Sequence, residues 1–269
     1  MSGATLSLAP AFARRWWRAG PRILPLALVV PILAITVWHF VSAAGLVPPL
    51  VLPAPAEVAQ ALREMIADGT IGGNLAISLR RGAAGFLLGG ACGFSLGAVM
   101  GLFPVAARAL RPTLFAVLHV PILAWIPLLM IPFGIGETLK YVVIGIAAFT
   151  PTLVHTVKSL NQVPSTLIEV GRIYRLSWHQ RLRHILLPAA LPGLFTGFRL
   201  GMTQAWQSLV VVELVASTSG IGYVCVMARQ VFRLDQMFAV MVVIGVVGYT
   251  LDRALRATEA RLARQWGAA

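Results

Sequence analysis

The sequence has little charge, and very little of it is negative. Only 12% of the 269 residues are charged, and nine Asp and Glu stand against 22 Lys and Arg. A soluble globular protein carries about 25% charged residues. So few charges cannot cover a water-exposed surface of this size, and 58% of the residues are hydrophobic. The composition therefore disfavours a soluble enzyme and predicts an all-α membrane protein.

Side chains that usually carry chemistry are also scarce. The two cysteines, Cys92 and Cys225, lie far apart in or beside apolar segments, so we expect small buried hydrophobic side chains, not metal ligands. The five histidines show no close metal-ligand pair, and no nucleophile has a credible base. The phosphate-binding pattern Gly-x-x-x-x-Gly-Lys-Ser/Thr is absent from the sequence. We therefore expect no metal site, no enzymatic centre and no ATP hydrolysis by this chain.

The net charge of +13 raises the alternative of nucleic-acid binding. However, the basic residues, nearly all of them Arg, are scattered at the ends of apolar segments and are not gathered on one polar face. This distribution is typical of the positive-inside rule of membrane proteins, in which Lys and Arg collect in cytoplasmic loops. The partner it indicates is a lipid bilayer, not a nucleic acid.

Six apolar runs are long enough to be membrane-spanning helices, which need roughly 20 residues each: 23–46, 84–102, 114–133, 141–157, 194–216 and 238–255. The predicted organisation is a cytoplasmic segment 1–22, a single transmembrane domain 23–255 of six helices, and a cytoplasmic tail 256–269. The first apolar run exceeds the 7–15 residues of a cleaved signal peptide. Four arginines precede this run and are expected to hold the N-terminus in the cytoplasm: Arg14, Arg15, Arg18 and Arg22.

The distribution of basic residues supports this orientation in the membrane. With both termini inside, the cytoplasmic segments hold fourteen Lys and Arg residues. The outer segments hold six, namely Arg63, Arg80, Arg81, Lys140, Arg229 and Arg233. The excess is on the side that the positive-inside rule requires.

Glycine recurs every four residues in the second apolar run, at Gly85, Gly89, Gly93, Gly97 and Gly101. Residues four apart lie on the same face of a helix, so these glycines form one smooth ridge. Small residues at this spacing let a second helix approach closely. The ridge predicts tight packing, either against a moving or neighbouring span or as a static contact within the subunit.

The predicted cytoplasmic loop 158–193 is too long and too patterned for a plain connector. Thr166 with Glu169 fits a helix-capping box, and Ser177 with Gln180 fits a second one. These boxes predict two short helices, at 167–175 and 178–187, with Pro188 and Pro192 ending the second and starting the next span. The second helix would gather Trp178, Leu182 and Ile185 on one apolar side, a pattern typical of a helix that docks into a partner's groove.

The chain resembles the permease subunit of bacterial type I ATP-binding-cassette importers, whose cytoplasmic loop reads Glu-Ala-Ala, three residues, Gly, and then about eleven residues before Leu-Pro. Glu169-Val170-Gly171 stands at the position of Glu-Ala-Ala, and Leu187-Pro188 matches the end of the motif. The aliphatic sulfonate, taurine and nitrate branch is the nearest in pattern. Its motifs run along most of the chain in order: 52–55, 124–129, 133–137, 187–192, Trp206, 212–214 and 219–223.

Two positions depart from the family pattern. Arg175 stands where the loop has Gly, and Pro132 stands where this branch has Trp. Arg cannot turn as freely as Gly, so the geometry between the two loop helices is put in doubt. Pro132 is expected to kink the end of the third span.

The resemblance implies the type I importer permease fold of six transmembrane helices, with the loop as the element that couples it to an ATPase. It implies a dimer of ATPase subunits that binds ATP and Mg, a second permease copy, and a periplasmic substrate-binding protein. This chain would bind no cofactor itself. The loop residues expected to contact the ATPase are Thr166, Leu167, Glu169, Gly171, Arg175, Ser177, Trp178 and Leu182. For Glu169, simple helix capping remains the alternative.

Polar residues inside the apolar runs are candidates for the translocation pathway, because a polar group in a bilayer is costly without a role or a partner. They are His119, Arg199, Gln204, Gln207 and Glu213. An anionic cargo would need donors such as Arg199 and the two glutamines, whereas Glu213 is expected to pair with Arg229 or Arg233. Interhelical hydrogen bonding is the alternative for each. A secondary transporter is the alternative function, but it would need more intramembrane ionisable groups and would leave the loop pattern unexplained.

Overall fold

The computed structural model describes residues 24–265, and every regular element in this range is a helix. The predicted segment 1–22 with its four arginines lies outside the described residues. The helices are α2 (Leu24–Ala43), α3 (Pro55–Ala67), α4 (Thr70–Leu102), α5 (Pro104–Leu118), α6 (Ile122–Phe133), α7 (Glu137–Asn161), α8 (Ser165–Ile173), α9 (Trp178–Arg181), the π-helical turn η1 (Leu182–Leu186), α10 (Leu187–Val215), α11 (Ile221–Gln230) and α12 (Leu234–Gln265). The all-α prediction is confirmed.

The chain divides into two compact units, residues 1–60 and 61–269. Within the first unit, the Trp38 indole N–H donates to the Pro53 carbonyl at 3.0 Å, which ties α2 to the segment before α3. The Glu57 carboxylate accepts a hydrogen bond from the Ala54 N–H at 2.8 Å, which satisfies a backbone donor at the start of α3.

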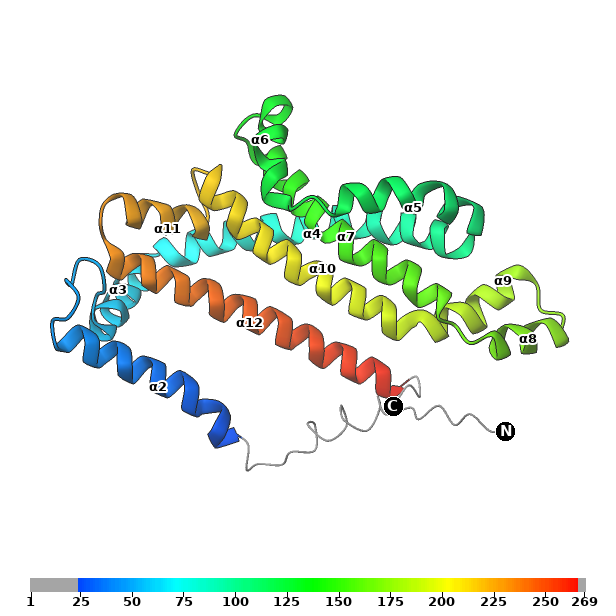
Figure 1. Ribbon diagram of the computed structural model, residues 1–269, viewed down its shortest axis with the longest axis horizontal. Coiled ribbons are helices and arrows are strands. Elements are labelled where there is room, and N and C mark those ends of the chain that lie inside the picture. The colour runs from blue at the N-terminus through cyan, green and yellow to red at the C-terminus, as the bar shows by residue number, and fades with distance from the viewer. Residues whose placement is uncertain (1–23, 266–269) are drawn as a thin grey trace, which may run out of the picture. The chain divides into compact units, whose positions relative to one another are not determined.

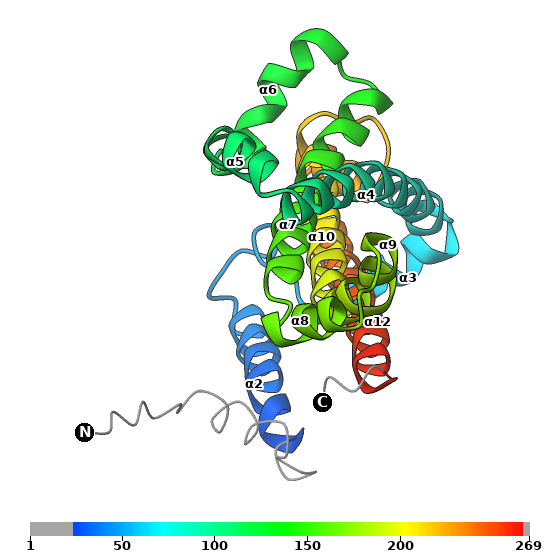
Figure 2. The same ribbon diagram turned by 90° about the vertical axis from the view of Figure 1, so that its right-hand side faces the viewer.

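The core of the second unit is formed by α4, α7 and α10, which pack along much of their lengths (Figures 1 and 2). The five-glycine ridge of α4 faces α7. A methyl group on Gly89 would lie 2.0 Å from the Gly145 carbonyl oxygen of α7, and one on Gly93 would lie 2.6 Å from the Phe149 carbonyl oxygen. The ridge is therefore a backbone-to-backbone contact inside the subunit, possible only because the side chains are hydrogen atoms.

Four helical stretches of the described residues are long and apolar enough to cross a membrane, starting at Thr70, Glu137, Trp178 and Leu234. The pair α5 and α6 makes a fifth if the two count as one span, although they are bent by 94°. The expectation of one continuous third helix at 114–133 is therefore wrong, because two helices that meet at a sharp bend cover these residues. The bend is at residues 119–121 and not at Pro132, because Pro121 disfavours a helical conformation at Val120 and starts the new helix.

The helix after the loop also differs from expectation, because Pro188 and Pro192 do not interrupt it. One helical stretch runs from Trp178 to Val215 through η1. In the π turn, the Leu187 N–H bonds to the Leu182 carbonyl, five residues back. We attribute the tolerance of Pro188 to this wider turn, which leaves room for a ring that would otherwise crowd the preceding turn. At the other end of the chain, α12 continues past residue 255 to Gln265 without a break.

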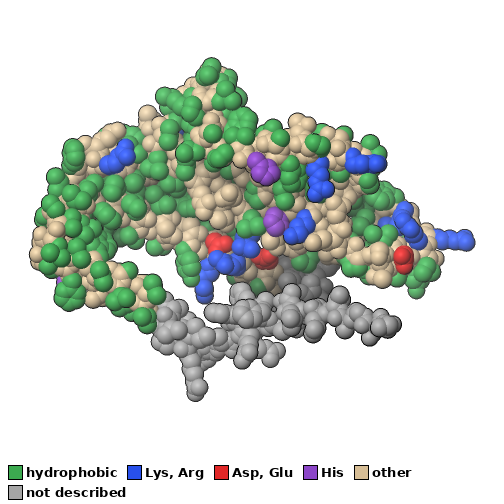
Figure 3. Space-filling view, in the orientation of Figure 1, with side chains coloured by type: hydrophobic (Ala, Val, Ile, Leu, Met, Phe, Trp, Pro, Cys, Tyr) green, Lys and Arg blue, Asp and Glu red, His purple; other side chains and the backbone are tan. Residues whose placement is uncertain are grey.

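Charged side chains are unevenly distributed over the surface. Figure 3 shows that Lys and Arg on this face lie mostly toward the end of the bundle that carries α8 and α9, while large areas elsewhere are hydrophobic. A surface of this kind suits a lipid environment around the middle of the bundle.

Candidate functional site: the loop, the central cavity and the buried charges

Helix α8 ends in a left-handed turn at Arg175, which has φ of 51°. The Arg175 N–H bonds to the Arg172 carbonyl at 2.9 Å, and the Leu176 N–H bonds to the Gly171 carbonyl at 3.0 Å. This pair of bonds is the Schellman motif, which commonly ends helices with Gly in the left-handed position. Arg175 therefore takes the left-handed position of this turn without being Gly, at a cost of roughly 1 kcal/mol.

The two predicted capping boxes have different outcomes. The one at Ser177 and Gln180 is present: the Ser177 N–H donates to the Gln180 side chain at 2.9 Å, and the Gln180 N–H donates to the Ser177 hydroxyl at 3.4 Å. The one at Thr166 and Glu169 is wrong. Helix α8 begins at Ser165, after Pro164, and no side chain caps it, so Thr166 is already inside the helix.

Gly171 holds α8 against the turn that follows α9. It is buried, and a methyl group on it would lie 2.7 Å from Ile185 Cδ1 and 3.2 Å from Arg181 Cγ. A larger residue would therefore displace the Ile185 and Arg181 side chains. The absence of a side chain at Gly171 lets α8 lie close to η1.

The other side of the loop exposes apolar side chains. We define the loop patch as Leu167, Val170, Ile173, Tyr174 and Trp178, which are between 42% and 77% exposed. Figure 1 shows α8 and α9 together at one end of α7 and α10. Of the other residues predicted to contact a partner, Glu169 and Ser177 are exposed and Leu182 is half-buried. The loop thus exposes apolar side chains on α8 and at the start of α9.

A cavity of about 490 Å³ lies at the bend between α5 and α6, facing α7 and α10. It brings together three of the predicted pathway residues, His119, Gln204 and Gln207. Trp125, Thr150 and Ser208 also line it, among aliphatic side chains. The cavity therefore offers several neutral hydrogen-bonding groups in an apolar wall, with no charged side chain among its lining residues.

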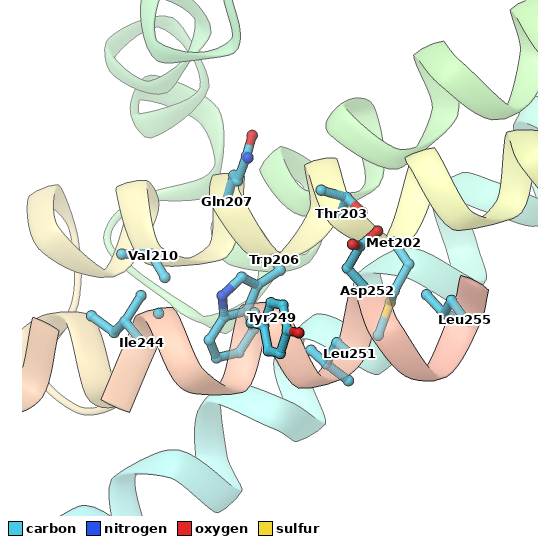
Figure 4. Close-up of a pocket in the computed structure, with 12 residues that line it drawn as sticks. Met202, Thr203, Trp206, Gln207, Val210, Ile244, Tyr249, Leu251, Asp252 and Leu255 are labelled. Carbon is cyan, nitrogen blue, oxygen red and sulfur yellow. The ribbon is translucent and has the colours of Figure 1, made fainter. Parts of the chain in front are cut away.

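Gln207 also borders a second cavity of about 380 Å³ between α10 and α12. Figure 4 shows Trp206 and Tyr249 between these two helices, while Gln207 points away from α12. The lining of this second cavity is mostly apolar, from Met202, Val210 and Ile244 to Leu255. We assign the second cavity to helix packing and the first to the candidate pathway.

Arg199 does not join the other predicted pathway residues. Its Nε donates to Glu259 at 2.7 Å, and its Nη1 lies 3.4 Å from Asp252. Both carboxylates are on α12, so this guanidinium ties α10 to α12 and is not available as a free donor for an anion. Glu259 was missed from the sequence because it lies beyond the predicted end of the last span.

Glu213 is fully buried and pairs with Arg81, which corrects the expectation of a partner at Arg229 or Arg233. Arg81 Nη1 donates to Glu213 at 2.9 Å, and the two side chains are 2% and 0% exposed. The Ser78 hydroxyl and the Gly222 N–H also donate to the Glu213 carboxylate, at 2.8 Å and 3.0 Å. The carboxylate thus has three different donors, which compensates for its burial.

Arg81 is the centre of a larger group that connects α4, α7, α10 and the segment before α11. Its Nη2 lies 2.5 Å from Glu137 at the start of α7, and its Nη1 donates to the Ser219 carbonyl at 2.7 Å. Lys140, itself buried, lies 2.8 Å from the same Glu137. We name Arg81, Glu137, Lys140 and Glu213 the charge cluster. Of these four, only Glu213 was among the site residues predicted from the sequence. Arg81 and Lys140 counted only as basic residues of outer segments, and Glu137 only as part of a family motif.

The described residues contain no group of three or more His, Cys, Asp or Glu side chains that could hold a metal ion. Burial raises the pKa of the Cys225 thiol on α11, and the smaller effect of nearby Arg229 opposes it. A thiol held protonated is a poor nucleophile. Neither observation points to catalysis in this part of the chain.

Comparison with known proteins matches residues 89–264 to the family described as "Binding-protein-dependent transport system inner membrane component". The chain is 35% identical over 253 residues to the putative aliphatic sulfonates transport permease protein SsuC of Bacillus subtilis, covering 94% of this chain and 89% of that protein. It is 32% identical over 233 residues to the taurine transport system permease protein TauC of Escherichia coli, covering 85% of each.

A solved structure of the MetNI methionine ABC transporter, in an inward-facing conformation, shares the fold. It superposes with a TM-score of 0.57 at 20% identity, covering 68% of this chain and 94% of that chain. The fold is therefore that of a type I importer permease, in agreement with the resemblance found in the motifs. The match of the family model over well over half of the sequence, together with relatives above 30% identity, shows that the chain belongs to the permease subunits of binding-protein-dependent ABC importers.

Proposed function

We propose that the loop patch docks on an ATPase subunit and that the cavity at the α5–α6 bend is part of the path of a small anionic solute, of sulfonate, taurine or nitrate type. The observation that carries the docking proposal is the loop patch itself. It exposes aromatic and aliphatic side chains on α8 and at the start of α9, where the other helices of this chain do not cover them.

An importer permease of this family needs an ATPase dimer and a solute-binding protein as partners. An ATPase dimer would bind ATP and Mg and close beneath the two permeases, which would draw the two loops together and rock the spans between inward-open and outward-open states. A periplasmic binding protein would deliver the solute on the other side. The loop and both termini would then be cytoplasmic, in agreement with the excess of Lys and Arg on that side.

A second permease copy would complete the pathway. Helix α6 exposes Leu123, Leu128 and Ile131 at 56%, 56% and 82%, and Figure 1 shows it standing away from the other helices of its unit. In a homodimer these side chains would pack on the partner. The cavity beside α6 would then face the interface between the copies, where a central channel is expected.

Replacing Ile173 by Asp in the loop patch should weaken binding of the ATPase about 30-fold or more, because truncating or charging a buried interface anchor typically costs about 2 kcal/mol. Ile173 is 77% exposed in the free chain, so its loss should leave the fold intact. The measurement is the affinity of the purified permease for the ATPase subunit of its transporter. Val231→Asp, at 58% exposure after α11, is the matched control and should bind normally. Equal affinities for the two variants would refute docking at the loop.

Glu169→Ala provides a second test at the same surface. Because no side chain caps α8, removing this carboxylate should not unfold the helix. Reduced stimulation of the ATPase in this variant would therefore indicate a contact with the partner and not a lost cap.

Gln204→Ala and Gln207→Ala should each slow solute uptake by up to about tenfold, since a hydrogen bond contributes roughly 0.5–1.5 kcal/mol. Both amides line the cavity at the α5–α6 bend. Uptake is measured in vesicles that contain the complete transporter. Gln230→Ala, at the exposed end of α11, is the control and should transport normally. Unchanged kinetics in both cavity variants would exclude the cavity from the pathway.

The cargo proposal uses the names of the relatives and the chemistry of the cavity together. A wall of amide, hydroxyl and imidazole groups in apolar surroundings suits a small solute with one anionic head that keeps its charge dispersed over several oxygens. A secondary transporter is disfavoured because the buried ionisable groups are engaged in the charge cluster and in the Arg199 pairs, which leaves them ill-suited to carrying ions across.

A further inference from the structure

A third cavity, of about 310 Å³, lies under the loop, where the ends of α4 and α7 meet α8, α9 and η1. Leu102, Leu160 and Ile185 form part of its apolar wall. Its polar lining comes from Asn161, Arg172 and Arg181. It is separate from the cavity at the α5–α6 bend, with which it shares no residue.

The charge of this cavity is of one sign. Arg172 and Arg181 both line it, and none of its lining residues is acidic. Glu169 lies on α8 but faces solvent and does not line the cavity. Two guanidinium groups that border one hollow without a carboxylate between them repel each other and favour an anion there.

Arg181 is also short of a hydrogen-bond acceptor. Its Nε is shut off from solvent without a hydrogen-bond partner, the single side-chain nitrogen or oxygen in this state among the described residues. Buried polar groups nearly always have a partner, and an unsatisfied one costs about 1–3 kcal/mol. This N–H, in a guanidinium that borders a cavity, leaves a donor open to an acceptor other than the described protein groups.

The surroundings hold this guanidinium in place. Arg181 Cζ lies 5.8 Å from the centre of the Trp178 ring, and the Arg181 stem packs beside Gly171. Stacking on an aromatic ring orients the planar group without satisfying its N–H donors. Arg181 is therefore pre-organised to bind a ligand with oxygen acceptors, at little further cost in side-chain entropy.

We propose that this cavity binds an oxyanion group, phosphate, sulfate or sulfonate, between Arg172 and Arg181. The fork of an arginine matches two oxygens of such a group. A free anion and the headgroup of an anionic phospholipid present the same chemistry. Because Arg172 belongs to α8 and Arg181 to α9, a bound anion would join the two sides of the turn at Arg175 and stiffen the loop patch. The proposal of an anion site does not depend on the proposal that the loop docks on an ATPase.

The test uses the full chain in nanodiscs of phosphatidylcholine, titrated with sodium sulfate against sodium chloride at constant ionic strength. Hydrogen exchange of residues 165–181 is the local readout. Sulfate should slow exchange in a saturable manner, and Arg181→Gln should weaken the effect about tenfold or more. Arg183→Gln is the matched control, because Arg183 is exposed near the same turn but does not line the cavity. Arg181→Lys keeps the stem and the charge, so an intermediate weakening is expected even if the Gln variant folds poorly.

A second arm replaces part of the lipid with phosphatidylglycerol. An unchanged affinity for sulfate would identify a free anion as the ligand. A lower apparent affinity for sulfate in the anionic lipid, by a factor that shrinks in Arg181→Gln but not in Arg183→Gln, would identify a lipid headgroup that competes for the same site. Absence of saturable protection by sulfate, by inorganic phosphate and by the anionic lipid would overturn the proposal. Equal protection in Arg181→Gln and Arg183→Gln would do the same.

Discussion

Replacing Arg81 by Met should destabilise the helical bundle by about 3–5 kcal/mol, the cost of leaving a buried carboxylate without its charged partner. Glu213 is 1% exposed as a residue, so water cannot replace the guanidinium. The same change would also remove the donors to Glu137 and Ser219, which link α4 to the start of α7 and to the segment before α11. The free energy of unfolding, measured by denaturation of the purified permease in mixed micelles, is the quantity to compare.

The neighbouring Arg80→Met is the control for this prediction. Arg80 is exposed and lies one residue away on the same helix, so its loss should change the free energy of unfolding by less than about 0.5 kcal/mol. A double variant, Arg81→Met with Glu213→Leu, should recover part of the stability, because it removes the unpaired charge as well. If Arg81→Met and Arg80→Met unfold alike, the charge cluster does not hold the bundle together.

The partner of Glu213 could not be predicted from the sequence, and the reason is distance along the chain. Arg81 lies 132 residues earlier, and periodicity and spacing report only on neighbours within a few turns. The glycine ridge of α4 and the capping box at Ser177 were accessible because each depends on residues three or four positions apart. One local signal was missed: Pro121 disfavours helix at the residue before it, and the bend between α5 and α6 is there.

Arg175 shows a different limit of sequence reasoning. The substitution of Gly was visible, and it put the turn between the loop helices in doubt. The structure keeps the turn, because the two Schellman hydrogen bonds and the packing of Gly171 on Ile185 determine the path of the chain. A conformational preference of roughly 1 kcal/mol is too small to override several such contacts. The family motifs therefore located the loop correctly, whereas the conformational preference of the single residue Arg175 did not predict the shape of its turn.

Gly89→Ala should destabilise the permease by about 3 kcal/mol, at the upper end of the range for inserting a methyl group into a packed core. The new methyl would lie 2.0 Å from the Gly145 carbonyl oxygen and 2.5 Å from its Cα. Both atoms belong to the backbone of α7, so no side-chain rotation can relieve the clash. The two helices would have to separate, and contacts along the rest of the glycine ridge would be lost with them.

Gly90→Ala, one residue further along α4, separates this effect from the change in helix propensity. A methyl on Gly90 would meet only the Phe86 ring, at an ordinary 3.6 Å. This variant should be neutral or more stable by up to about 1 kcal/mol, since Ala favours helix over Gly. Both variants gain the same preference, so the difference in their free energies of unfolding measures the close approach of α4 to α7. If that difference is below about 1 kcal/mol, the two helices can separate at little cost, and the ridge is not the rigid contact that the distances indicate.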